Sequence, residues 1–352
     1  MQETTKDERL GSERLGKLMV SLAVPAVAAQ LINVLYNIVD RIYIGHIQGY
    51  GDMALTGVGV TFPIIMLIAA FSAFAGMGGA PLASIQLGKH DYDRAELILG
   101  NSAGLLVIFS VVLTIGFSIF KTPVLYAFGA SETTIQYAES YIGIYLLGTI
   151  FVQFAVGLNT FISGQGEARI AMLSVLIGAI INICLDPVFI FVFGMGVKGA
   201  ALATIISQAV SAAWVIKFLT SKKSVIRLKA KNMRLKGDVV KHIGGLGISP
   251  FIMQSTESLV NITLNSGLQK YGGDLYVGTM SIMTSIMQLI VIPIQGITQG
   301  VQPIISYNYG AGNKSRVKGA IIRLIAVCFT GNDRSCRDCR LCTGRLCGNI
   351  YE

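Results

Sequence analysis

The segment NICLDP, which begins at Asn182, places an amide and a carboxylate four residues apart inside an apolar run. Within residues 170–197, Asp186 is the only charged side chain. On a helix, Asn182 and Asp186 share one face, while Pro187 has no N–H to donate to the carbonyl oxygen of Ile183. A carboxylate, an amide and a free carbonyl oxygen together suit a proton or a Na⁺ ion.

A bare charge in the lipid core costs at least about 3 kcal/mol, and the cost falls if the group faces water, binds a cation or takes a proton. The next charged residue after Asp186 is Lys198, so Asp186 lies roughly two to three helical turns deep. A functional acid is the favoured interpretation. The alternative is an aspartate near a helix end that reaches the membrane interface.

Two further acids lie in or beside apolar runs. Asp40 follows the first run and precedes Arg41, so an ordinary acid–base pair at the membrane border is the alternative there. Glu257 lies near the middle of the seventh run and is a functional candidate by default. The alternative for Glu257 is a pairing with its polar neighbours Gln254, Ser255 and Asn261.

The composition requires a membrane around these acids. Of the 352 residues, 53% are hydrophobic and 13% are charged, against about 25% charged in ordinary soluble domains. The mean hydropathy is +0.63, and runs of 20 or more apolar residues suit helices that cross the bilayer. An all-α polytopic membrane protein is therefore predicted, with a soluble all-helical core as the alternative. The first sixteen residues do not resemble a cleavable signal.

The apolar runs and the basic residues together predict the topology. The predicted spans are 17–39, 54–86, 97–120, 135–163, 170–194, 197–219, 243–268, 276–308 and 319–329. Most basic residues fall on the side of the N-terminus, and the other side has only Arg41, Lys121, Lys198 and Lys270. This bias predicts a cytoplasmic N-terminus. The basic stretch 217–241 is interpreted as a connector on that side, with anionic-lipid binding as a further option; no nucleic-acid partner is expected.

The chain nearly repeats itself. Pro25 matches Pro250 at an offset of 225 residues, and Gly88 matches Gly310 at an offset of 222. Six spans separate the copies, so the two copies keep one orientation, as in transporters built from two parallel repeats; chance alignment of apolar sequence is the alternative. The predicted domains are an N-terminal segment (1–16), an N-lobe of six spans (17–219), a basic linker (220–241), a partial C-lobe (242–329) and an atypical tail (330–352).

Three stretches resemble the multidrug and toxic compound extrusion (MATE) transporters, especially the bacterial multidrug-export subgroup. They are SLAVPAVAAQLINVLYNIVDRIYIG at 21–45, GLNTFISGQGEAR at 157–169 and NICLDPVFIFVFGMGVKGAALAT at 182–204. The patterns P-x14-D and N-x3-D-P are fairly specific in combination. The resemblance covers roughly residues 10–328 and implies a MATE-like two-lobe fold with about nine of twelve spans present.

The resemblance also implies a function. Such a protein is an antiporter of the bacterial inner membrane that exports amphiphilic or cationic compounds in exchange for Na⁺ or H⁺ by alternating access. It is not an enzyme, needs no cofactor beyond the coupling ion, and is expected to be a monomer in the bilayer. The implied coupling site consists of Asp40, Asn182, Asp186 and Thr204, with Tyr36, Tyr141 and Asn159 as neighbours and Glu257 as the acid of the C-lobe.

The C-terminus departs from the family pattern. After residue 330 the sequence becomes rich in arginine and cysteine, with the spacing C-x2-C-x2-C-x4-C. A frameshifted end is the favoured interpretation, a disordered tail or a metal or iron–sulfur ligand set the alternatives. The rival functions are a lipid-linked saccharide flippase of the same superfamily, a membrane-bound redox protein and a truncated, inactive transporter. Arg41 is the only basic residue near an N-lobe span, which favours a cationic cargo over a pyrophosphate.

Overall fold

The computed structural model describes residues 8–328, with the side chains of 274–290 only in part. Every regular element in this part of the chain is helical, as predicted. The elements are α1 (Glu8–Ser12), α2 (Leu15–Gly45), α3 (Gly51–Gly88), α4 (Tyr92–Ala127), α5 (Ile135–Leu147), α6 (Thr149–Gln153), η1 (Phe154–Leu158), α7 (Asn159–Gly164), α8 (Ala168–Pro187), η2 (Val188–Val192), α9 (Val197–Thr220), η3 (Ala230–Met233) and α10 (Gly237–Gly310). A further helix covers 314–328. The predicted tail at 330–352 lies outside the described residues.

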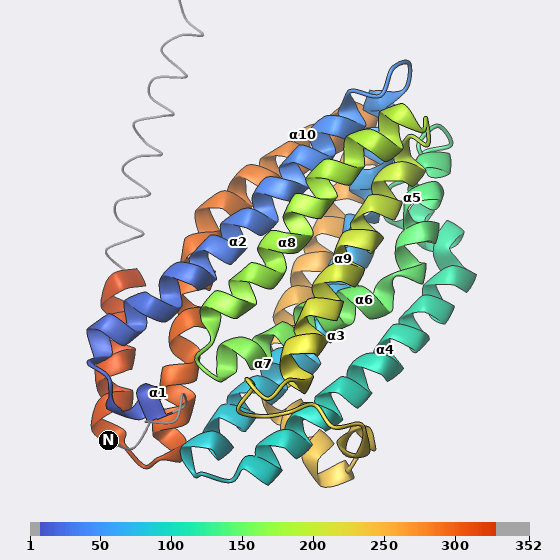
Figure 1. The fold of residues 1–352 in the computed structure, drawn as a ribbon. Coiled ribbons are helices and arrows are strands. Elements are labelled where there is room, and N and C mark those ends of the chain that lie inside the picture. The colour runs from blue at the N-terminus through green and yellow to red at the C-terminus, as the bar shows by residue number, and fades with distance from the viewer. Residues whose placement is uncertain (1–7, 329–352) are drawn as a thin grey trace, which may run out of the picture.

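The long helices run side by side as a bundle (Figure 1). α10 consists of two limbs, 237–272 and 274–310, because Gly273 adopts φ 69° and ψ −167° and reverses the chain. Positive φ is accessible to glycine without a steric penalty. The limbs correspond to the predicted spans 243–268 and 276–308.

Length and apolar composition identify five described helices that can cross a bilayer, namely α2, α3, α4, α8 with η2, and α9. The predicted span 135–163 is not one straight helix. It is bent by 64° between α5 and the helices from Thr149 to Gly164. At the bend, Gly148 packs so closely on α9 that an added Cβ would lie 2.5 Å from Ile205 Cγ1. The bent pair, α5 and the helices from Thr149 to Gly164, counts as a sixth span if its two halves cross the bilayer together.

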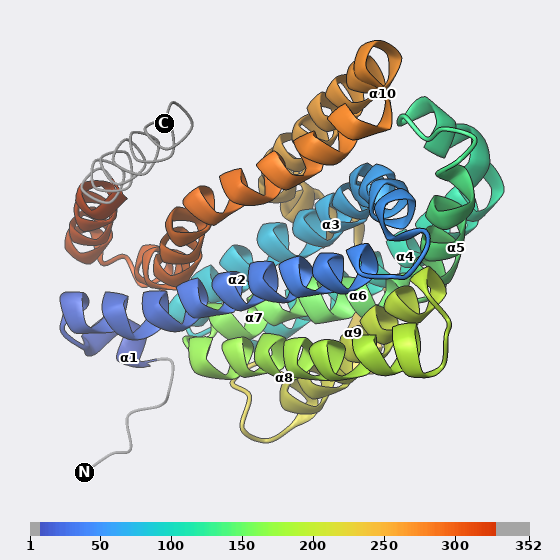
Figure 2. The same ribbon diagram turned by 90° about the horizontal axis from the view of Figure 1, so that it is seen from above.

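The first span is longer than predicted. The prediction ends it at residue 39, but α2 continues to Gly45 because the residues after Arg41 are again apolar. Asp40 therefore lies more than one turn inside the helix. In Figure 2, α2 lies between α8 on one side and α10 on the other, and it contacts both. We call α1–α9 the N-lobe, and α10 with the helix at 314–328 the C-lobe.

The lobes meet where α3 and the second limb of α10 end. A Cβ on Gly88 would lie 2.0 Å from the carbonyl oxygen of Tyr307, and a Cβ on Gly310 would lie 2.0 Å from that of Ile85. Gly88 and Gly310 are 222 residues apart, as are Ile85 and Tyr307. The contact is therefore reciprocal, as expected of equivalent surfaces around a two-fold axis.

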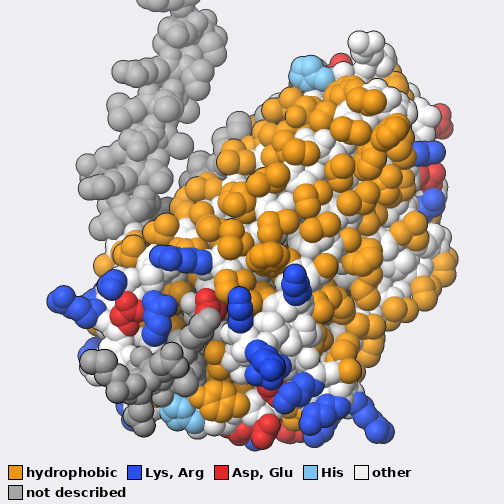
Figure 3. All heavy atoms as spheres, in the orientation of Figure 1, with side chains coloured by type: hydrophobic (Ala, Val, Ile, Leu, Met, Phe, Trp, Pro, Cys, Tyr) orange, Lys and Arg blue, Asp and Glu red, His pale blue; other side chains and the backbone are white. Residues whose placement is uncertain are grey.

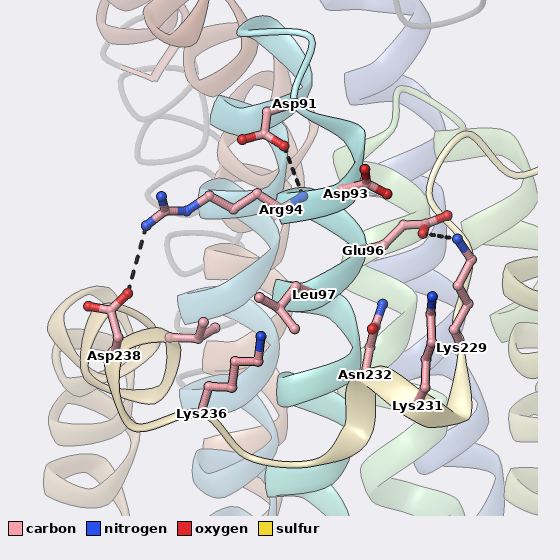
Figure 4. Close-up of a pocket in the computed structure, with 11 residues that line it drawn as sticks. Asp91, Asp93, Arg94, Glu96, Leu97, Lys229, Lys231, Asn232, Lys236 and Asp238 are labelled. Carbon is pink, nitrogen blue, oxygen red and sulfur yellow. Dashed lines mark hydrogen bonds and ion pairs between the residues drawn. The ribbon is translucent and has the colours of Figure 1, made fainter.

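Two arginines extend this contact in the same reciprocal way. Arg94 of the N-lobe pairs with Asp238 of the C-lobe at 3.8 Å (Figure 4). Arg316 of the C-lobe donates through Nη2 to the carbonyl oxygen of Glu13 at 2.8 Å. Arg94 and Arg316 are related by the repeat offset of 222, and Glu13 and Asp238 by the offset of 225. Each lobe thus contacts the start of the other.

The segment between α9 and α10 is fixed on the N-lobe. The Oε1 atom of Gln165 accepts the backbone N–H of Val225 at 2.8 Å. The Oδ1 atom of Asn101 accepts that of Lys236 at 2.7 Å, and Glu96 forms an ion pair with Lys229 (Figure 4). Between the end of α9 at Thr220 and the start of α10 at Gly237, this segment lies within the predicted linker 220–241.

Charge is distributed unevenly over the surface. In Figure 3 a broad apolar band covers the flank of the bundle, and lysine and arginine side chains gather at its lower end. We call this end, where α3 and α10 end and the linker lies, the basic end. One core cluster contains residues of both lobes, among them Leu87, Ile243 and Ile304. The fully buried members of the second cluster, as far as the structure describes them, all come from the N-lobe. The described core therefore joins the lobes at the basic end.

Candidate functional site

The acid of the NICLDP segment lies in the last turn of α8 and is fully buried, with 0% of its surface exposed. Asn182, one turn earlier, is equally buried. Its Nδ2 atom donates to Asp186 Oδ1 at 3.2 Å. The four-residue spacing thus brings the amide and the carboxylate together, as the sequence predicts. Asp186 faces the interior of the protein rather than the membrane interface.

Helix α9 adds a hydroxyl group to this pair. Asn182 Nδ2 also lies 3.5 Å from Thr204 Oγ1, and the Thr204 hydroxyl donates to the carbonyl oxygen of Ala200 at 3.0 Å. Since this hydroxyl proton is engaged by its own helix, the oxygen of Thr204 remains an acceptor toward the cluster.

The second carboxylate comes from α2. Asp40 is buried and close enough to Asp186 for the two carboxylates to interact electrostatically. The neighbouring Arg41 also interacts with Asp40. Its guanidinium lies over the ring of Phe62, 5.4 Å from the centroid. Two acidic side chains are therefore buried on helices that pack against each other, α2 and α8.

Three oxygens in this cluster are buried without a hydrogen-bond partner among the described residues. They are Asp40 Oδ1, Asn182 Oδ1 and Asp186 Oδ2. Buried polar atoms are normally paired, and three such oxygens in one cluster are acceptors that a proton or a cation would satisfy. No set of three or more His, Cys, Asp or Glu side chains with metal-ligand geometry exists in the described chain. The donors here are mixed carboxylate, amide and hydroxyl oxygens, which hard cations prefer.

Two tyrosines border the acidic cluster. Tyr141 on α5 is buried and lies near Thr204 and Asp40. Tyr36, one turn before Asp40 on α2, interacts with both Asp40 and Asp186. Tyr36 also lines the neighbouring cavity. The cluster and the cavity therefore share one side chain.

That cavity is lined mainly by the N-lobe, with Gln254 and Gln299 of the C-lobe on one side, and has a volume of about 260 Å³. Its described wall contains alanine, serine, methionine, amide and tyrosine side chains and no charged residue. Gln30 on α2 donates to Gln299 on the second limb of α10 at 2.9 Å and thereby links the two lobes across it. The cavity can receive a small or flexible amphiphilic molecule.

Two candidate residues lie elsewhere. Asn159 lines the cavity and bonds to α8 about three to four turns away from Asp186, through the carbonyl oxygen of Ala171 at 3.1 Å and the hydroxyl of Ser174 at 3.1 Å. Glu257 is exposed on the first limb of α10, and its backbone carbonyl accepts from Asn261 Nδ2 at 3.0 Å. Asn159 therefore belongs to the cavity wall, and Glu257 is an exposed residue of the C-lobe.

Sequence reasoning missed the amides of the cavity. Gln30, Gln208 and Gln299 line the cavity. They are neutral, and the sequence prediction considered mainly charged residues. The sequence feature that could have identified them is an amide side chain inside a strongly apolar run. Because an unpaired amide is costly in lipid, such a residue indicates a wet or protein-facing surface.

The fold agrees with the comparison to known proteins. A family model, MatE, matches residues 25–188 and 250–330. The chain therefore belongs to the MATE family, whose members are transporters.

Named relatives support the same assignment. The multidrug export protein MepA of Staphylococcus haemolyticus is 28% identical over 335 residues, which cover 92% of this chain and 73% of MepA. The MATE multidrug transporter DinF-BH, solved in complex with rhodamine 6G, is 36% identical with a TM-score of 0.88, covering 94% of this chain and 73% of DinF-BH. An outward-facing MATE transporter of the MOP superfamily is 26% identical with a TM-score of 0.84. The match covers 94% of this chain and 73% of that transporter.

Proposed function

We propose that this chain is a secondary active antiporter that exports amphiphilic or cationic compounds in exchange for Na⁺ or H⁺. In this proposal the basic end faces the cytoplasm, because positive charge is retained on that side during insertion. The membrane is then the bacterial inner membrane, which maintains gradients of both ions. The acidic cluster is the coupling site and the cavity is the substrate site.

The observation that carries the proposal is the set of unpartnered buried oxygens on Asp40, Asn182 and Asp186. Two buried carboxylates within electrostatic range repel each other when both are charged, and each has lost its hydration. A bound Na⁺ or a proton offsets both costs. The cluster is therefore more stable with a bound cation or proton. The free energy of ion binding can then drive substrate export.

Coupling to the substrate proceeds in this proposal through α2. Tyr36 borders the cavity and the cluster at once, and Pro25 interrupts the hydrogen bonding of the same helix. Loading of Asp186 changes the position of α2 and thereby the shape of the cavity. An ion and a substrate that favour different states of one helix compete without touching.

The closed contact at the basic end supports alternating access. The crossing of Gly88 and Gly310 and the contacts of Arg94 and Arg316 hold the lobes together there. A transporter with that end closed can release substrate only toward the opposite side. The inward-directed state requires these contacts to separate.

The neutral cavity wall favours an amphiphilic cargo. A pyrophosphate-linked saccharide would need several lysine or arginine side chains, and none lines this cavity within the described residues. An amphiphilic cation instead finds amide oxygens, a tyrosine ring and methionine side chains. Rhodamine 6G, the compound present with the transporter DinF-BH, is therefore a suitable probe, as is ethidium.

The test is dye accumulation in an efflux-deficient bacterial host. We expect the wild-type chain to lower the accumulation of ethidium and rhodamine 6G, and Asp186→Asn to abolish this effect because the amide cannot exchange a cation. Asp52→Asn is the matched control, since Asp52 is an exposed aspartate at the start of α3. Membrane abundance of each variant is measured by immunoblot. A wild-type chain that is abundant but exports no dye contradicts the proposed function, and normal export by Asp186→Asn contradicts the coupling site.

A further inference from the structure

A separate pocket lies at the basic end, between the end of α3 and the helix at 314–328. Its volume is about 700 Å³. It is outside the cavity and the acidic cluster described above. Among its lining residues are Lys89, Tyr309, Lys314, Lys318, Ile321 and Ile322.

The charged part of this pocket is purely cationic. Lys89 comes from the N-lobe, and Lys314 and Lys318 lie one turn apart on the C-lobe helix. No carboxylate is among the described lining residues. Two nearby acids are engaged elsewhere. Asp91 accepts the backbone N–H of Arg94 at 3.0 Å. Glu13 accepts from Arg9 at 3.0 Å, and this bond lowers the pKa of the Glu13 carboxyl.

The apolar part of the pocket continues along the same helix. Ile321 and Ile322 follow Lys318 by three and four residues, so they lie one turn further toward the bilayer core. Their side chains are 39% and 56% exposed, and Tyr309 beside them is 69% exposed. Lysines at a helix end above exposed isoleucines match a molecule with an anionic head and an apolar tail.

We propose that this pocket binds an anionic phospholipid. Lys89, Lys314 and Lys318 bind its phosphate, and its acyl chain lies along Ile321 and Ile322. A free phosphate ion would use the lysines but leave the isoleucines exposed. A zwitterionic lipid would bring the positive charge of its headgroup close to three lysines.

The site lies directly beside the contact between the lobes. Lys89 follows Gly88, and Lys314 is four residues after Gly310. Asn308, which also lines the pocket, donates to the carbonyl oxygen of Leu10 in the N-lobe at 2.8 Å. A lipid that binds lysines of both lobes therefore stabilises the state in which the basic end is closed.

Native mass spectrometry of the full chain tests this site. The protein is released from mixed micelles that contain phosphatidylglycerol or phosphatidylcholine, and retained lipids are counted. We expect retention of phosphatidylglycerol by the wild type. The double variant Lys314→Gln/Lys318→Gln should bind it about 25-fold more weakly, at roughly fivefold per lysine. The control Lys222→Gln/Lys223→Gln removes two exposed lysines of the linker and should change the affinity less than about twofold.

Three outcomes overturn the proposal. Equal weakening in the control variant indicates general surface charge, and equal retention of phosphatidylcholine removes the role of the lysines. Displacement of the lipid by inorganic phosphate or glycerol phosphate, which lack acyl chains, indicates a free-anion site. Thermal unfolding of each variant is recorded alongside, so a lipid loss that accompanies misfolding is recognised, and Lys89→Gln then provides the second test. None of these readouts depends on drug transport.

Discussion

At the level of single residues, the acidic cluster combines two carboxylates with the neutral side chains of Asn182 and Thr204, which form different hydrogen bonds. Asn182 holds Asp186 through Nδ2 and leaves its own Oδ1 unpartnered. The Thr204 hydroxyl donates a hydrogen bond within its own helix, and its oxygen accepts from the amide of Asn182. The geometry of the carboxylate therefore depends on two uncharged side chains.

The hydroxyl of Thr204 can be tested by itself. Thr204→Val keeps the shape but removes the oxygen, and we expect dye export to fall about fivefold, the equivalent of one hydrogen bond of about 1 kcal/mol. Thr204→Ser retains the hydroxyl and should export at nearly the wild-type rate. The measurement is the initial rate of dye efflux from preloaded cells. Equal rates for the valine and serine variants would show that the oxygen has no part in coupling.

Among the helices, the ends of α3 and α10 cross at a distance that only glycine allows. A Cβ at Gly88 or at Gly310 would overlap a carbonyl oxygen of the other helix. Backbone atoms cannot rotate away as a flexible side chain can. The crossing therefore fixes how closely the lobes approach at the basic end.

Alanine at either glycine should separate these helices. We expect Gly88→Ala and Gly310→Ala each to lower the free energy of unfolding by about 1–3 kcal/mol through overpacking. Gly116→Ala on α4 is the control, because no atom lies within 4 Å of its added Cβ. That variant should be neutral or slightly stabilised, since alanine favours a helix over glycine. Thermal unfolding in detergent measures all three, and a melting temperature for Gly88→Ala equal to that of Gly116→Ala would contradict the close crossing.

For the molecule as a whole, a coupling site of this kind links ion binding to stability. A ligand that binds only the folded state raises its stability by about 2.7 kcal/mol at a hundred times the dissociation constant. We expect the melting temperature of the wild type to rise with Na⁺ against choline, and Asp186→Asn to show no rise. A Na⁺-independent but pH-dependent wild type assigns H⁺ as the coupling ion. A wild type that responds to neither ion, with protein still folded by circular dichroism, would remove the cluster as a cation site.

The class of protein could be predicted from the amino-acid order. Apolar runs predicted helices in a bilayer, because a spanning segment must satisfy its own backbone hydrogen bonds. The matches of Pro25 with Pro250 and of Gly88 with Gly310 indicated two related lobes. The pairing of Asn182 with Asp186 followed from helical spacing alone, since residues four apart lie on one face.

Which distant residues share a site depended on the assembled fold. The pattern could not show that Asp40 is buried within electrostatic range of Asp186, that Asn159 lines the cavity instead, or that Glu257 is exposed. These outcomes depend on how helices rotate and cross, which is set by packing between side chains far apart in the chain. For the same reason, the bend at Gly148 and the reciprocal crossing of Gly88 and Gly310 became visible only when the helices were assembled.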